Sequence, residues 1–330
     1  MKQFGIYGLA FAAMSCIFLL ANGCSAPSKG PVVAEEQDQS VKLALKFVPG
    51  DSTSYKVALE TGKSVEWEGQ APRPKGFKGG HTSSKMEMTF SQQIETIGEQ
   101  GDAVARITIE GLKYVTTIKD NAILDFDSSR DKGEDHPLNN LIGRSYTIAI
   151  TPSGEVSRII DTSDALAAVS ADKTAVALLS ADAIRQRHAV PALPATGENQ
   201  LRPGEDWSNV KSVSFDMMGA KSYERIYTLK EIKDVDNRRV AVVGMDAFPS
   251  AARAKELHKG QSIDLFSHMS DSTEDYAGEL KLDLTEGKVA EYKEKLVVEW
   301  LIVDPNPKKD KPPAALKIAA TRLFGIERMD

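Results

Sequence analysis

Alternating acidic residues form the candidate cation-binding segment of this chain. The alternating positions from 125 to 131 hold Asp125, Asp127, Ser129 and Asp131. Carboxylates at alternating positions of a loop can converge on a hard cation such as calcium. A calcium loop, however, needs glycine at its sixth position and a bidentate glutamate at its twelfth, where this chain has Arg130 and His136. We therefore interpret the segment as an acidic surface loop that leaves a strand, and expect no metal site.

Histidine and serine are the other residue types that could do chemistry. The five histidines are His81, His136, His188, His258 and His268, and no two have the spacing of helical metal ligands. The chain has no Gly-x-Ser-x-Gly elbow, His-Glu-x-x-His motif, phosphate-binding glycine loop or dinucleotide fingerprint. A triad assembled in space from the many serines and aspartates stays open, but it needs a positioned base. We predict that the protein is not an enzyme and uses no cofactor.

Cys24 is a third reactive candidate, because it follows an apolar N-terminal run. Lys2 precedes the apolar stretch 4–21, and Ala-Asn-Gly then leads to the cysteine. This junction resembles a lipobox, where a diacylglycerol is attached to the cysteine sulfur and the chain is cut just before it. The resemblance implies that residues 1–23 are a signal peptide and that Cys24 is the lipid-attachment site. An ordinary secretory signal and an uncut membrane anchor are the alternatives.

Cysteine usage and charge narrow the class of protein. Cys16 lies inside the apolar run and would leave with it, so no thiol would remain for a disulfide, a metal or a nucleophile. The formal net charge is −6, with 41% hydrophobic and 27% charged residues. This composition indicates a globular domain and argues against nucleic acid as a partner. Residues 24–40 are poor in large apolar residues, which is typical of a flexible tether.

The positions of apolar residues predict a protein built mainly of β-strands. Apolar and polar residues alternate in the segments 55–59, 86–90, 105–109, 146–150, 213–217 and 280–284. A period of two indicates half-buried antiparallel strands. Turn sequences such as Asp236-Asn237 and Glu286-Gly287 fall where hairpins need them. We predict a mainly β, β-rich α+β fold with curved antiparallel sheets.

The segment 161–188 departs from the strand pattern. It is rich in alanine and lacks glycine and proline, and Pro191 follows it. Thr162 or Ser163 can cap its start, and apolar residues at helical spacing, Val176, Leu179 and Ala183, predict an amphipathic face. We predict one or two helices that cover one end of a sheet. A movable lid over a ligand cavity is the alternative.

The two halves of the chain share a weak pattern. The hairpins 90–112 and 146–156 of the first half resemble 225–245 and 280–289 of the second. Alternation makes all hairpins alike, so internal duplication and chance similarity both stay open. If the duplication is real, two similar half-barrel-like units span 41–190, with the helical segment, and 191–330.

Several short segments resemble an uncharacterised family of secreted bacterial β-rich lipoproteins. They are the export signal and the stretches 123–128, 153–156 and 204–207, the last ending at Trp207. Together they cover about a third of the chain. The resemblance implies a lipid-anchored domain of the cell envelope and brings no activity. If the cell has two membranes, Ser25 after the cysteine resembles an outer-membrane address, with the domain facing the periplasm or the surface.

Two functions of different classes fit these features. We predict first a structural or interaction domain with a filled core, which binds the membrane through its acyl anchor and presents loops to an envelope protein. The alternative is a carrier or binding protein for a lipid or other apolar ligand on a concave sheet, and a hydrolase ranks third. A carrier needs an apolar cavity of roughly several hundred Å³, whereas a structural domain fills its interior to crystal-like density.

Overall fold

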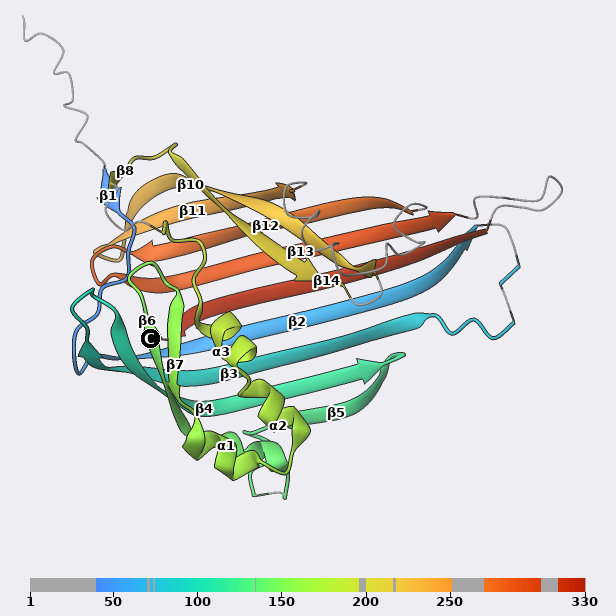
Figure 1. Ribbon diagram of the computed structural model, residues 1–330, viewed down its shortest axis with the longest axis horizontal. Coiled ribbons are helices and arrows are strands. Elements are labelled where there is room, and N and C mark those ends of the chain that lie inside the picture. The colour runs from blue at the N-terminus through green and yellow to red at the C-terminus, as the bar shows by residue number, and fades with distance from the viewer. Residues whose placement is uncertain are drawn as a thin grey trace, which may run out of the picture. The chain divides into compact units, whose positions relative to one another are not determined.

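The computed structural model describes residues 40–69, 72–73, 75–133, 135–195, 200–215, 218–250, 270–303 and 314–329. These residues belong to one compact unit, Gln39–Asp330. The expected signal peptide, Cys24 and all but the last residue of the tether lie outside the described residues, as does the end of the alternating segment 213–217. The mainly β fold with large antiparallel sheets is confirmed (Figure 1).

Twelve strands in the described part of the chain form one antiparallel sheet. They are β2 (Ser52–Gly69), β3 (Gly80–Ile97), β4 (Ala103–Ile118), β5 (Asn121–Asp127), β6 (Ser145–Ile150), β7 (Val156–Asp161), β9 (Asp206–Ser214), β10 (Ala220–Val235), β11 (Arg238–Pro249), β12 (Ser270–Asp283), β13 (Lys288–Val303) and β14 (Ala314–Met329). Two further strands, β1 (Val41–Lys42) and β8 (Gln200–Leu201), pair with each other.

The order of strands in the large sheet is β7-β6-β4-β3-β2-β14-β13-β12-β11-β10-β9, with β5 paired to β4. Strands that follow one another in the chain are neighbours almost throughout. The exception in the middle of the sheet is β14, which pairs with β2 from Ala314↔Gly69 to Met329↔Ser54. The strands of 41–190 and of 191–330 therefore share one sheet, whose edges come from the middle of the chain. The internal duplication stays a prediction.

Alternation along each strand separates the two faces of the sheet. In β13, Tyr292, Leu296 and Trp300 are buried on one face, while Lys293 and Lys295 lie on the other and are exposed. Bulges interrupt the register in several strand pairs, including β3 with β4 and β10 with β11. Each bulge bends the strand that carries it and increases its local twist, which is consistent with the expected curvature of the sheet.

Two of the tight hairpins turn through a pair of residues with positive φ, and only one of these turns was predicted from its sequence. Asp236 and Asn237 join β10 to β11 with positive φ angles of 50° and 63°, and Lys119 and Asp120 join β4 to β5 with angles of 52° and 63°. Positive φ at both central residues matches the right-handed twist of the flanking strands. The turn expected at Asp236-Asn237 is thus confirmed.

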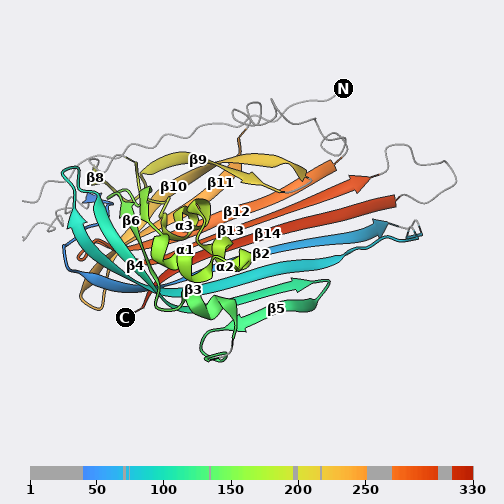
Figure 2. The ribbon, with the colours of Figure 1, turned by 60° about the horizontal axis from the view of Figure 1, so that its bottom comes forward.

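The segment 161–188 forms three short helices, α1 (Ser163–Val169), α2 (Lys173–Leu178) and α3 (Ala181–His188), rather than one or two. The chain breaks where a polar residue caps the next helix. The Asp172 carboxylate accepts from Ala175 N at 2.7 Å, and the Ser180 hydroxyl accepts from Ala183 N at 3.3 Å. Figures 1 and 2 show the three helices over one face of the sheet, which we call the inner face. A 3₁₀-helix, η1 (Pro137–Leu141), packs against α1 and α2.

Candidate functional site

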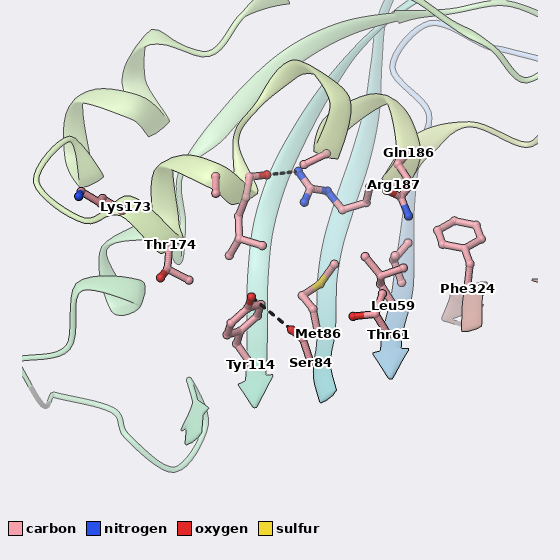
Figure 3. Close-up of a pocket in the computed structure, with 14 residues that line it drawn as sticks. Leu59, Thr61, Ser84, Met86, Tyr114, Lys173, Thr174, Gln186, Arg187 and Phe324 are labelled. Atoms are coloured by element: carbon pink, nitrogen blue, oxygen red, sulfur yellow. Dashed lines mark hydrogen bonds between the residues drawn. The ribbon is translucent and has the colours of Figure 1, made fainter. Parts of the chain in front are cut away.

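The helices do not fill the space above the inner face. A cavity of about 400 Å³ lies between α2 and α3 on one side and β2, β3, β4 and β14 on the other (Figure 3). Its apolar wall consists of Val57, Leu59, Met86, Leu178 and Phe324. Ser84 and Tyr114 add hydroxyl groups, and the serine donates to the tyrosine oxygen at 3.3 Å. A mostly apolar hollow with a few polar groups is the usual form of a small-molecule site.

A second cavity, of about 370 Å³, adjoins the first on the same face. The two share Thr61 and Ser84 as lining residues. Phe215 and Trp300 form part of the wall of the second cavity, with their rings edge to face and 5.2 Å between centroids. The pair of cavities thus follows the inner face from the helices toward β9.

The charges along these cavities have one sign. Lys173 and Arg187 line the first cavity, and Lys63 and Arg322 line the second. Among the described residues that line them there is no aspartate or glutamate. This is notable in a chain whose formal net charge is −6. The two hollows therefore present an environment that favours negative over positive ligand groups.

Arg187 is a charged residue buried at the first cavity, with 2% of its surface exposed. Its Nε and Nη2 donate to the hydroxyl oxygen of Tyr146 at 3.2 and 3.1 Å, and Nη2 also donates to the carbonyl of Leu178 at 3.1 Å. Leu178 ends α2, so the guanidinium satisfies one of the carbonyls that a helix end leaves without a partner. These contacts hold α2, α3 and β6 together.

His188 completes this buried chain of polar groups. Its Nε2 lies 2.6 Å from the hydroxyl of Tyr146, and its ring packs edge to face on Phe90. Burial lowers the pKa of His188 well below the usual value, and the charge of Arg187 lowers it further. A neutral Nε2 can accept the hydroxyl proton of Tyr146, whose oxygen then accepts from Arg187. Burial also raises the pKa of Tyr146.

A second buried polar cluster lies on the inner face under β9 and β10. The carboxylate of Glu294 accepts from Tyr292 at 2.9 Å and from Tyr276 at 3.3 Å, and it pairs with Lys211 and with Arg225. Burial opposes ionisation of this carboxyl, but the two cations outweigh it and hold its pKa below the usual value. The cluster lines neither cavity, so we assign it to the core.

The acidic segment near residue 130 binds its own arginine. Arg130, at the position where a calcium loop has glycine, pairs with Asp131 at 2.6 Å and with Asp125 at 3.2 Å. Asp127 accepts from the amide and hydroxyl of Ser129. In the part of the chain that the structure describes, no group of three or more histidine, cysteine or acidic residues could hold a metal ion.

The three described histidines lie in unrelated surroundings. His81 is exposed in β3 near Asp120, His136 caps η1 and stacks on Phe126, and His188 is buried. His258, His268 and the lipid-attachment candidate Cys24 lie outside the described residues. Sequence reasoning missed Arg187 and Glu294. Glu294 stands between Tyr292 and Leu296 at an inward position of β13, where alternation predicts an apolar residue. This exception to the pattern could have indicated the second cluster.

Comparison with known proteins gave no family. No family model and no curated protein matches the chain. Similar solved structures include lipovitellin, from a study of its lipid–protein interactions, with 13% identity and a TM-score of 0.40 over 86% of this chain. This chain spans 26% of the lipovitellin chain.

Two further structures show weaker similarity. DynF of the dynemicin pathway of Micromonospora chersina has 8% identity and a TM-score of 0.18, over 91% of this chain and 92% of its own. The outer membrane protein OprG of Pseudomonas aeruginosa has 5% identity and a TM-score of 0.13, over 85% and 98%. All three scores lie below the level that a shared fold requires. Within the described residues, the helices are all too short or too polar to span a bilayer.

Proposed function

We propose that this protein binds an apolar or amphipathic ligand on the inner face of its sheet. The observation that supports the proposal is the pair of adjoining cavities, of about 400 and 370 Å³. Small-molecule sites have volumes of about 300–1,000 Å³, whereas packed interiors hold few voids larger than a water molecule. The cavities favour the carrier alternative over the filled structural domain that the sequence placed first.

Contacts with the rest of the protein hold the three helices over the site. Each of the three has eight residues or fewer, which is too short to be stable without tertiary contacts. Their positions therefore depend on contacts with β6 and the connection before it, such as Arg187 with Tyr146 and the ion pair of Arg144 with Asp164 at 3.3 Å. We propose that these helices cover the ligand, with its chain between Leu178 and Met86.

The cellular setting is part of the proposal. We propose that acylation of Cys24 anchors the protein to a membrane of the cell envelope, and that residues 24–40 tether the binding domain to it. In a cell with two membranes this would be the outer one, with the domain facing the periplasm or the surface. The protein would act without catalysis, and its partners would be the membrane, the apolar ligand and, on the structural alternative, an envelope protein rather than nucleic acid.

Uptake of a fluorescent apolar probe by purified, unacylated protein tests the binding function. Thr61 lines both cavities, so Thr61→Trp places an indole at their junction. The control is Glu60→Trp, because neighbouring strand residues point to opposite faces and Glu60 lines a hollow on the outer face. Thr61→Trp is expected to weaken 1-N-phenylnaphthylamine binding at least about tenfold, and Glu60→Trp to leave it unchanged.

The same protein also gives a probe-free test. Organic extracts of the native protein are expected to contain an apolar compound in mass spectrometry. Wild-type protein that takes up no probe and yields no such compound would contradict the binding function. The structural or interaction domain would then be the function that the fold supports.

A further inference from the structure

We infer that the cavity beneath α2 and α3 selects an acyl-chain ligand with an anionic head group, and that Arg187 binds this head. The inference rests on the proposed binding function and adds the chemical class of the ligand. A guanidinium removed from water is strongly destabilised unless an anion or enough hydrogen bonds compensate for its lost hydration.

The protein partners of Arg187 do not supply that anion. The guanidinium donates only to a hydroxyl and a backbone carbonyl, both of them neutral. Among the described residues no carboxylate forms an ion pair with it, and its Nη1 makes no hydrogen bond. Arg225 is similarly buried, at 5% exposed, but it lies 3.5 Å from the Glu294 carboxylate. The centre of the Arg187 guanidinium also lies 5.7 Å from the centroid of the Tyr146 ring. Within the described residues, this buried charge thus faces neutral acceptors and an aromatic ring but no carboxylate.

The guanidinium of Arg187 lies beside the apolar wall of the cavity. Figure 3 shows its side chain between the helices and Met86, on the helix side of the cavity, which Lys173 and Gln186 also line. The apolar side chains of Leu59 and Phe324 continue from there toward the second cavity. A carboxylate or phosphodiester at Nη1 would receive charge-assisted hydrogen bonds, while its acyl chain follows the wall. Since no acidic residue lines either cavity among those described, nothing there repels such a head.

The test compares two probes with the same acyl chain, the anionic cis-parinaric acid and its neutral methyl ester, above pH 8. Wild-type protein is expected to bind the acid at least about tenfold more tightly than the ester, as one charge-assisted hydrogen bond provides. Arg187→Met is expected to remove this preference and leave ester binding in place. Arg185→Met is the control, because Arg185 lies on the same helix, is exposed, and lines only the outer side of the helices.

The possible results distinguish failure of the role of Arg187 from failure of the proposed binding function. Equal affinity of wild-type protein for acid and ester, or an unchanged ratio in a folded Arg187→Met variant, would overturn the role of Arg187 and keep the binding function. Absence of binding by both probes would overturn the two together. If Arg187→Met does not fold, thermal shifts of wild-type protein decide, because the acid must raise its Tm more than the ester does. Acetate carries the carboxylate head group but lacks the long acyl chain. Displacement of the acid probe by millimolar acetate would therefore overturn the requirement for an acyl chain.

Discussion

Leu59 of β2 and Phe324 of β14 lie directly opposite each other in the sheet, and both line the cavity beneath α2 and α3. The two strands come from opposite ends of the described chain. The floor of this cavity is therefore built where the first and last long strands meet. The ligand binding that we propose would thus depend on a pairing that forms only when both halves of the chain are folded.

Two adjacent leucines at the end of α2, Leu178 and its C-cap Leu179, separate binding from stability. Leu178 is half-buried and lines the cavity, whereas Leu179, at 3% exposed, is part of the packed core. Leu179→Asn is expected to lower the free energy of unfolding by about 2–5 kcal/mol, measured by urea denaturation. Leu178→Asn is expected to lower it by less than about 1 kcal/mol and to weaken uptake of the apolar probe. A larger stability loss for Leu178→Asn than for Leu179→Asn would contradict this assignment.

The buried His188 predicts that stability falls in mild acid. Its pKa in the folded protein lies well below the usual value near 6.5, so below about pH 6.5 the unfolded chain binds a proton that the folded chain does not. The free energy of unfolding is expected to fall by about 1.4 kcal/mol between pH 7.5 and pH 5.5 from this group. His188→Gln keeps an acceptor for Tyr146 and removes the titration. A pH slope identical in this variant and in wild-type protein would count against the prediction.

Two glutamate–lysine pairs are expected to differ in their effect on stability. Glu294 is buried between Lys211 and Arg225, while Glu327 pairs with Lys56 at 2.9 Å on an exposed surface. Glu294→Gln leaves two cations without their anion and is expected to lower the free energy of unfolding by about 3–5 kcal/mol. Glu327→Gln is expected to lower it by less than about 1 kcal/mol. Urea denaturation measures both, and similar small losses would show that the cluster is hydrated.

Acylation at Cys24 is tested by metabolic labelling with a clickable fatty acid. The Gly-Cys junction after the apolar run predicts labelling of the wild-type protein and none of Cys24→Ala. The folded domain is expected to keep its Tm, because the described strands and helices begin at Val41. Equal labelling of the two proteins would rule out the lipid anchor, and recovery in the inner membrane would rule out the outer-membrane address.

The alternating segments 86–90 and 280–284 were enough to predict strands, because each strand buries one face. The pairing of β2 with β14 has no such local signal, since it joins segments from opposite ends of the sequence. The breaks between helices were readable from Asp172 and Ser180, which cap the helices that follow. The cavity could not be predicted, because alternation shows which side chains face inward and not how much space they leave. No local pattern in the sequence marks Arg187 as buried, because its burial depends on the distant Tyr146.

The pairing of β2 with β14 also bears on how fast the protein can fold. The hairpins from β2 to β4 and from β9 to β14 pair strands that follow one another in the chain, but the β2–β14 pairing must close a loop that holds most of the chain. Long-range pairings of this kind slow folding, because chain entropy is lost before contacts compensate for it. Met329 lies close to the start of β2 at Ser52, since it pairs with Ser54. A circularly permuted chain, in which a linker joins Met329 to Ser40 so that β1 is kept and which is opened between α3 and β8, would bring β14 and β2 close together in sequence. It should refold faster than wild-type protein in stopped-flow measurements.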